Sequence, residues 1–122
     1  MMGVGAWRRD LWLAIGAALT AHVVVLQQSQ LVESPCAGAI LGAIEAASQG
    51  EPPGIESASG QVAIFEQRVD AVTPAACAAL SRIGRANLDV AATAHHLLLR
   101  QHGLDLLEAA LLTRLTLVEL AG

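Results

Sequence analysis

Apolar residues dominate the first quarter of the chain. The segment Leu11–Leu26 contains no Asp, Glu, Lys or Arg; Arg8 and Arg9 precede it, and Glu33 is the next charged residue after it. As a helix this run spans about 24 Å, somewhat less than the roughly 30 Å hydrocarbon core of a bilayer. Basic residues before an apolar segment favour a cytoplasmic N-terminus. We therefore expect a membrane anchor that begins in the cytoplasm.

The large apolar side chains of this run are the ones expected to contact lipid. They are Trp12, Leu13, Ile15, Leu19, Val24 and Leu26. Two other interpretations stay open, because a secretory signal has the same basic start and apolar centre, and because an apolar run this short also occurs in the core of soluble proteins. The predicted location is the bacterial inner membrane, with membrane lipid as a partner; an exported or a cytoplasmic protein is the alternative.

The middle of the chain changes from helical periodicity to turn-forming residues and back. Residues 36–49 follow Pro35 and predict a short helix. The next segment, 50–60, is rich in Pro, Gly and Ser and predicts a linker. In residues 61–72 the spacing of Val62, Phe65 and Val69 predicts an apolar helix face, with Glu66 set away from it.

The last part of the chain predicts two helices that pack antiparallel. Residues 75–101 carry positions spaced by three and four that predict a seam of coiled-coil type. This seam consists of Leu80, Ile83, Asn87, Val90, Ala94 and Leu97. Gly103 then predicts a helix end, and residues 104–120 predict a leucine-rich final helix.

These elements predict an all-α fold in three parts. Residues 1–30 form the hydrophobic N-terminal helix, residues 31–60 a short helix and the linker, and residues 61–122 an antiparallel helical hairpin that serves as an interaction module. With 122 residues there is little material left for the buried pocket of an enzyme.

The final helix has more apolar surface than one neighbouring helix can cover. Nine of its seventeen residues are Leu or Val, and an exposed apolar patch of this size marks a contact with another chain. The predicted interaction residues are Leu104, Leu107, Leu111, Leu115 and Val118. We expect self-association through this helix and contacts with other protein subunits.

Composition and charge limit which classes of molecule this protein is expected to bind. The chain is 54% hydrophobic but only 2% aromatic, and its formal net charge is −4. Nucleic-acid binding needs basic surface and stacking side chains, so no nucleic-acid partner is expected. The scarcity of large aromatic residues also means that the core has few anchors, which favours dependence on a partner.

Two cysteines, Cys36 and Cys77, are 41 positions apart. This spacing fits neither a zinc ribbon nor a thioredoxin-type motif. If the body of the protein is exported, the two cysteines can form a disulfide; in the cytosol they would be small buried apolar residues. The sequence leaves both alternatives open.

Residue patterns typical of catalysis are missing from the sequence. The chain has no Gly-rich phosphate loop, no nucleophile elbow and no His-Glu-x-x-His helix. His95 and His96 are adjacent, so on a helix they point about 100° apart and do not share a metal ion. Arg85 and Asp89 are spaced as a weak surface pair. We expect no enzyme activity, no metal and no cofactor.

Two segments resemble a known family. Residues 61–69, with Phe65 and Glu66, and residues 111–122, with Arg114, Leu115, Thr116 and Glu119, are similar to the inner-rod proteins of type III secretion systems. The resemblance implies a short helical protein, poor in aromatic residues, whose leucine-rich terminal helix polymerises within the export apparatus. The hydrophobic N-terminal run has no counterpart in that family.

Together these features predict a non-enzymatic helical structural or assembly subunit of a membrane-associated complex. A secretion-apparatus rod component is its most concrete form. The alternative is a single-pass membrane protein that scaffolds or regulates a larger complex.

Overall fold

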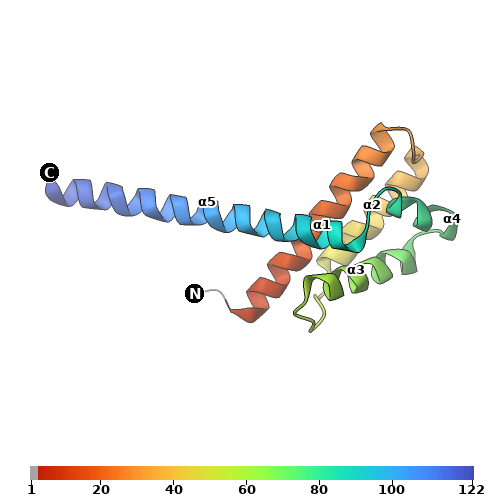
Figure 1. The fold of residues 1–122 in the computed structure, drawn as a ribbon, viewed down its shortest axis with the longest axis horizontal. Helices are drawn as coiled ribbons and strands as arrows, with labels where there is room; N and C mark the ends of the chain where they lie inside the picture. Colours follow the sequence, from red (N-terminus) through yellow and green to blue (C-terminus); the bar gives the residue numbers. More distant parts are fainter. Residues whose placement is uncertain (1–2) are drawn as a thin grey trace.

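The computed structural model describes residues 3–122, and every regular element in this range is helical. The elements are α1 (Val4–Gln28), α2 (Ser34–Gln49), α3 (Ala58–Val72), α4 (Ala75–Ala78), the 3-10 helix η1 (Ala79–Arg82) and α5 (Asn87–Ala121). Helices α1 to α4 and the start of α5 form one body, from which the rest of α5 projects (Figure 1). The predicted all-α class is confirmed.

The centre of the body is the contact between Trp12 of α1 and Phe65 of α3. Both side chains are completely buried, and their ring centroids lie 4.6 Å apart. The Trp12 indole Nε1 donates a hydrogen bond of 2.9 Å to the carbonyl oxygen of Ala47 in α2. The Arg68 guanidinium lies 4.8 Å from the centre of the Trp12 ring, within reach of a cation–π interaction. One indole thus joins three helices.

Gly16 allows α1 to approach its neighbours at this centre. A Cβ atom placed there would lie 2.4 Å from the Ser48 hydroxyl oxygen and 3.3 Å from the Cζ atom of Phe65. The Ser48 hydroxyl is itself committed to a hydrogen bond with the carbonyl of Ile44. A side chain at position 16 would therefore push α1 away from α2 and α3.

The apolar N-terminal run lies within α1 as predicted, and its residues face two environments. The stretch Gly5–Gln28 is long and apolar enough to cross a membrane, yet 44% of its most apolar window is buried inside the protein. Among the residues expected to contact lipid, Trp12, Ile15, Leu19 and Leu26 are buried in the core. Val24 is half-buried and Leu13 is exposed. In this structure α1 is the central helix of the body.

The connection between α2 and α3 is shorter than the predicted linker and is held in place. Helix α3 begins at Ala58, because the Ser57 hydroxyl accepts a hydrogen bond from the Gly60 backbone N–H and caps the helix. The buried Gln61 side chain donates to the carbonyl of Ile55 at 3.0 Å. Arg68 donates to the carbonyl of Glu51. These bonds fix the connection against α3.

The predicted helix over residues 75–101 is interrupted. After α4 and η1 the chain turns at Gly84, whose φ of +72° lies in the left-handed region that glycine adopts most readily. Helix α5 then begins at Asn87. The predicted seam from Leu80 to Leu97 therefore does not lie on one helix.

The helix end predicted at Gly103 is wrong. Helix α5 runs without a break from Asn87 to Ala121, so one long helix takes the place of the hairpin expected within residues 75–120, which is not confirmed. A glycine inside a helix costs about 1 kcal/mol relative to alanine. Leucines lie on both sides of Gly103, and leucine favours helix.

The packing of Trp12 leads to a test of the fold. We expect Trp12→Ala to lower the free energy of unfolding by roughly 3–5 kcal/mol, because it removes a large buried side chain and leaves a cavity. Denaturant titration followed by circular dichroism measures this change. Leu88→Ala is the control, because Leu88 is exposed on α5. A loss from Trp12→Ala as small as that of the control would contradict the placement of α1 in the core.

Candidate functional site

The part of α5 that leaves the body is the most unusual feature of the molecule (Figure 1). Near its start α5 packs on α1 and α3 and buries Val90, Ala91, Ala94 and Leu98. From Gly103 to Gly122 every residue is exposed. Most of the stability of a helix in a protein comes from packing its apolar face, and this segment has no such packing on the body. The exposed apolar residues of this segment, here called the projecting helix, are therefore the candidate site.

The five predicted interaction residues lie on one face of the projecting helix. Leu104, Leu107, Leu111, Leu115 and Val118 are 50–61% exposed. Their spacings of three, four, four and three residues confine them to an arc of about 80°, since successive residues on a helix are about 100° apart. We call these five residues the apolar stripe.

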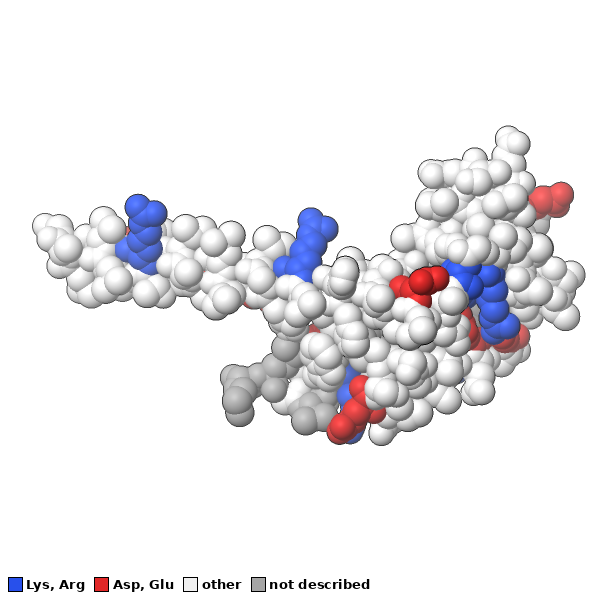
Figure 2. Space-filling model, viewed as in Figure 1, with Lys and Arg blue, Asp and Glu red and all other residues white. Residues whose placement is uncertain are grey.

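The apolar stripe lies to one side of the face of α5 that packs on the body. The face of α5 that packs on the body continues along the projecting helix mainly as polar residues. These are Gln101, Asp105, Glu108, Thr116 and Glu119, with Leu112 among them. The stripe lies roughly a third of a turn from this face, so the chain's own body does not cover it. Figure 2 shows a mostly uncharged surface along the projecting helix, whereas acidic and basic groups gather on the body.

Two ion pairs fix the turn that leads into α5. Arg85 binds the carboxylate of Glu66, and both side chains are buried. Arg82 binds Asp70, and its Nε also lies 3.9 Å from Glu66. Both carboxylates belong to α3, so these pairs hold the chain segment before α5 against that helix. Removing one partner of such a buried ion pair destabilises the fold, because the remaining charge is left buried and uncompensated.

These pairs correct two expectations from the sequence. Glu66 was predicted to lie away from the apolar face of its helix, but it is buried between the arginines. Arg85 pairs with Glu66 and not with Asp89; the Asp89 carboxylate instead accepts a hydrogen bond of 3.0 Å from the Ala86 N–H and caps α5. Sequence spacing identified local partners only, and the partner of Arg85 is 19 positions away.

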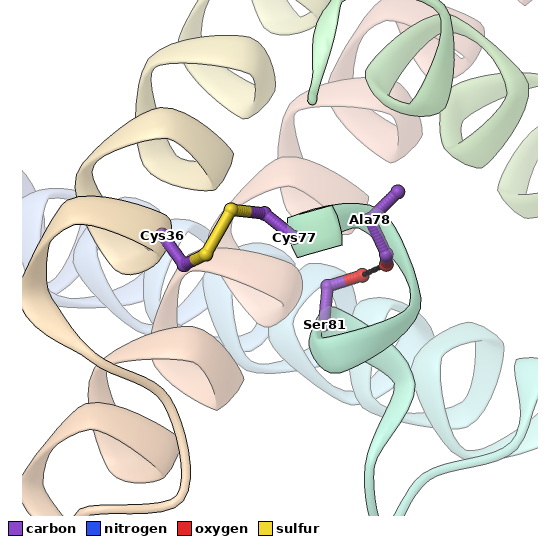
Figure 3. Close-up of a disulfide and its surroundings, with 4 residues drawn as sticks. All are labelled: Cys36, Cys77, Ala78 and Ser81. Carbon is purple, nitrogen blue, oxygen red and sulfur yellow. Dashed lines mark hydrogen bonds between the residues drawn. A yellow bond between two sulfur atoms is a disulfide. The ribbon is translucent and has the colours of Figure 1, made fainter. Parts of the chain in front are cut away.

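A disulfide between Cys36 and Cys77 provides a covalent link near the same turn. It joins the first turn of α2 to α4 (Figure 3), with a Cα–Cα distance of 5.2 Å. Directly after it, the Ser81 hydroxyl donates to the carbonyl of Ala78 at 2.9 Å. The structure thus answers the question that the sequence left open: the two cysteines are paired.

Aromatic contacts hold α5 at the point where it leaves the body. The Trp7 ring stacks with His95 and with His102, each at a centroid distance of 6.3 Å. The sequence predicted no metal site at His95 and His96, and it did not predict this contact with Trp7. The spacing of seven residues between His95 and His102, which puts both on one face of a helix, was the available signal.

A groove separates α1 from α5 beside these contacts. Its volume is about 720 Å³, and it is lined by apolar residues that include Leu13, Ala17 and Leu97, with Asp10 and Arg100 among its polar residues. Leu104, the first residue of the apolar stripe, also lines it. The groove and the stripe are therefore continuous.

Ionisable side chains are the remaining candidates for chemistry in the described residues. Across residues 3–122 no three His, Cys, Asp or Glu side chains gather in a way that could hold a metal ion. The ionisable residue of the apolar run, His22, has its Nε2 atom 2.8 Å from the carbonyl oxygen of Ile83. The arrangement is suited to packing against another apolar surface.

The residues that resemble a secretion rod fall into two places. Phe65 and Glu66 are buried in the body, whereas Arg114, Leu115, Thr116 and Glu119 lie on the projecting helix. The fold does not bring the two groups into one site. No protein-family model matches the chain, and neither a search of characterised proteins nor one of solved structures finds a match. The resemblance stays a prediction.

The disulfide generates a test of how the body is held. Replacing both cysteines, Cys36→Ser with Cys77→Ser, should lower the free energy of unfolding by about 4 kcal/mol, because a closed loop of this length limits the entropy of the unfolded chain. Thermal and denaturant unfolding measure the loss. Adding a reductant to the unchanged protein should reproduce most of it and leave the double variant unaffected. Equal stability of all these samples would show that the link does not restrain the fold.

Proposed function

We propose that this protein is a non-enzymatic helical assembly subunit. A small body held by a disulfide carries the projecting helix, and the apolar stripe on that helix binds other protein subunits, copies of this chain included. The observation that carries the proposal is the run of exposed residues from Gly103 to Gly122 in a helix whose apolar stripe the body leaves uncovered.

Burial of the stripe supplies the driving force for assembly. Each fully buried Leu or Val side chain contributes roughly 1.5–3 kcal/mol relative to an exposed one. Amphipathic helices that lay an apolar face on a partner, with contacts three and four residues apart, are a recurrent mode of protein recognition. A segment without apolar packing on the body thus gains its stability from the partner.

The disulfide favours a compartment outside the cytoplasm, because such bonds persist in oxidising surroundings. In the alternative in which α1 leaves the body and spans a membrane, Arg8 and Arg9 before it favour a cytoplasmic N-terminus and direct the following chain across. Our proposal therefore places the body on the outer side of a bacterial inner membrane. Assembly as a rod component of a secretion apparatus is the most concrete form of this function, and its support is the resemblance of the two segments.

Charge in the apolar stripe tests the proposal. We expect Leu107→Asp with Leu111→Asp to abolish self-association, because carboxylates replace the apolar contacts in the middle of the stripe. Light scattering on a size-exclusion column measures the mass of each variant. The matched control is Leu106→Asp with Leu117→Asp, which lie more than 100° from the centre of the stripe on the same helix, where exposure is 73% and 62%.

The two pairs of substitutions give different results only if the stripe is the interface. The control should keep the mass of the unchanged protein. Equal masses for the stripe variant and the unchanged protein, both above that of one chain, would exclude the stripe as the site of assembly. Circular dichroism shows whether either variant has lost its helical body.

A second candidate function rests on α1. The helix has 24 residues, Gly5–Gln28, that are long and apolar enough to cross a membrane. A single-pass membrane scaffold or regulatory protein would use α1 as its anchor, with lipid around it. To do so α1 must leave the body, and Trp12 must give up its contacts with Phe65 and Ala47.

One substitution separates an anchor from a core helix. Ala17 is exposed in the folded body, so Ala17→Arg should be tolerated there. In the middle of a membrane helix the same change costs roughly 2.5–3.5 kcal/mol. Carbonate extraction of membranes is the measurement. If α1 is a core helix, the unchanged protein and Ala17→Arg behave alike; retention of the unchanged protein with release of Ala17→Arg would establish the anchor.

Adding Leu19→Arg serves as the reference for a damaged helix. Leu19 is buried in the folded body, so this change should disturb both the core and the anchor. The variant with both substitutions therefore shows what the extraction measures when α1 can neither pack in the core nor span a membrane.

A further inference from the structure

We infer that the apolar stripe pairs with the stripe of a second copy of this chain, and that the two projecting helices run parallel and in register. This inference rests on the proposed function, because it names the partner and the geometry of the same site. Its basis is the placement of charged side chains beside the stripe.

The two edges of the stripe carry opposite charges. With about 100° between successive residues, Arg114 lies about 60° to one side of the centre of the stripe and Glu119 about 80° to the other. Glu108 shares the edge of Glu119. Both Arg114 and Glu119 belong to the exposed part of α5, and neither has an ion-pair partner within the described chain.

A parallel pair brings these opposite charges together. When two helices pack side by side in the same direction, the left edge of one faces the right edge of the other, and the side chains that meet are five positions apart. Arg114 of each copy then meets Glu119 of the second copy, which gives two ion pairs across the stripe. Charged pairs at such flanking positions set the partner and direction of paired helices.

An antiparallel pair does the opposite. With Leu111 packed on Leu111, the acidic edge of each helix lies against the acidic edge of the other, so Glu108 and Glu119 gather without a cation. Arg114 then lies on the edge that carries Arg114 in the second copy. Like charges that face each other destabilise a helix pair, so the charges favour the parallel arrangement.

The body does not obstruct a parallel pair. Because the stripe lies roughly a third of a turn from the face of α5 that packs on the body, a two-fold axis along the helices puts the two bodies on opposite sides. Arg100, one turn before Leu104, is in line with the stripe and borders the groove between α1 and α5. The apolar contact therefore ends near Leu104.

Cross-linking of single introduced cysteines tests the geometry. Both native cysteines are in the disulfide, so a new thiol is the reactive one. In a parallel pair Val118→Cys should form a disulfide-linked dimer on mild oxidation. In an antiparallel pair the two 118 positions are about 21 Å apart at 1.5 Å per residue, and no link forms. Non-reducing electrophoresis and mass spectrometry of the linked peptide measure the product.

Two further variants complete the test. Leu111→Cys should form a linked dimer in both the parallel and the antiparallel arrangement, and its link shows that the stripes meet. Thr113→Cys, on the opposite face of the helix, should form no link. Links at 111 without links at 118 would overturn the parallel arrangement and leave the proposed function intact. A mass above two chains would overturn the pair. A single-chain mass at every concentration would contradict both the pair and self-association.

Charge reversal tests the ion pairs directly. Arg114→Glu alone, or Glu119→Arg alone, should raise the dimer dissociation constant roughly five- to tenfold, because each removes two attractions and creates two repulsions at exposed positions. The double variant restores opposite charges and should recover most of the affinity. Sedimentation equilibrium gives the constants. Independent effects of the two reversals, with no recovery in the double variant, would show that these residues do not meet.

Discussion

The indole of Trp12 is the interaction on which the rest of the structure depends. It is buried against Phe65, donates its one hydrogen to the carbonyl of Ala47 and is covered by Arg68. A chain with a single Phe and no Tyr has few large side chains for a core, so one aromatic contact links α1, α2 and α3. Because Gly16 lies one turn further along α1, the helices come close enough for this contact to form.

Around this centre, the remaining restraints converge on the start of α5. The disulfide joins α2 to α4, and the arginines of the following turn bind Glu66 and Asp70 on α3. Trp7 stacks on the histidines near the point where α5 leaves the body. Together these contacts fix the direction in which the projecting helix extends, although nothing in the body contacts its outer part.

This division of the molecule has a physical consequence. The body holds its own apolar residues in a core, whereas the projecting helix has its leucines exposed and no apolar packing on the body to stabilise it. A protein built in this way presents an apolar surface at a fixed angle to its body. Assembly through that surface buries the exposed leucines of the projecting helix. The charges at the edges of the stripe decide in which direction a second helix lies.

Much of the molecule follows from its sequence, because local periodicity is sufficient for it. The helical class and the shared face of the five residues of the apolar stripe depend on spacings of three and four residues, which any helix must obey. The role of α1 is different. An apolar run has the same composition in a membrane and in a core, and only its contacts with Phe65 and Ala47 show which surface it packs on here.

Two glycines in the C-terminal half show most clearly that local sequence does not determine where the chain turns. By sequence, Gly103 predicted a helix end and Gly84 predicted nothing, yet the chain turns at Gly84 and remains helical through Gly103. The reason is that Arg82 and Arg85 on either side of Gly84 are bound by carboxylates of α3, which are far away in the chain. Sequence determined which residues can form helices and which face of the last helix is apolar. Tertiary structure decided where the chain turns, that the cysteines pair and that the stripe stays uncovered, because these depend on contacts between residues distant in sequence.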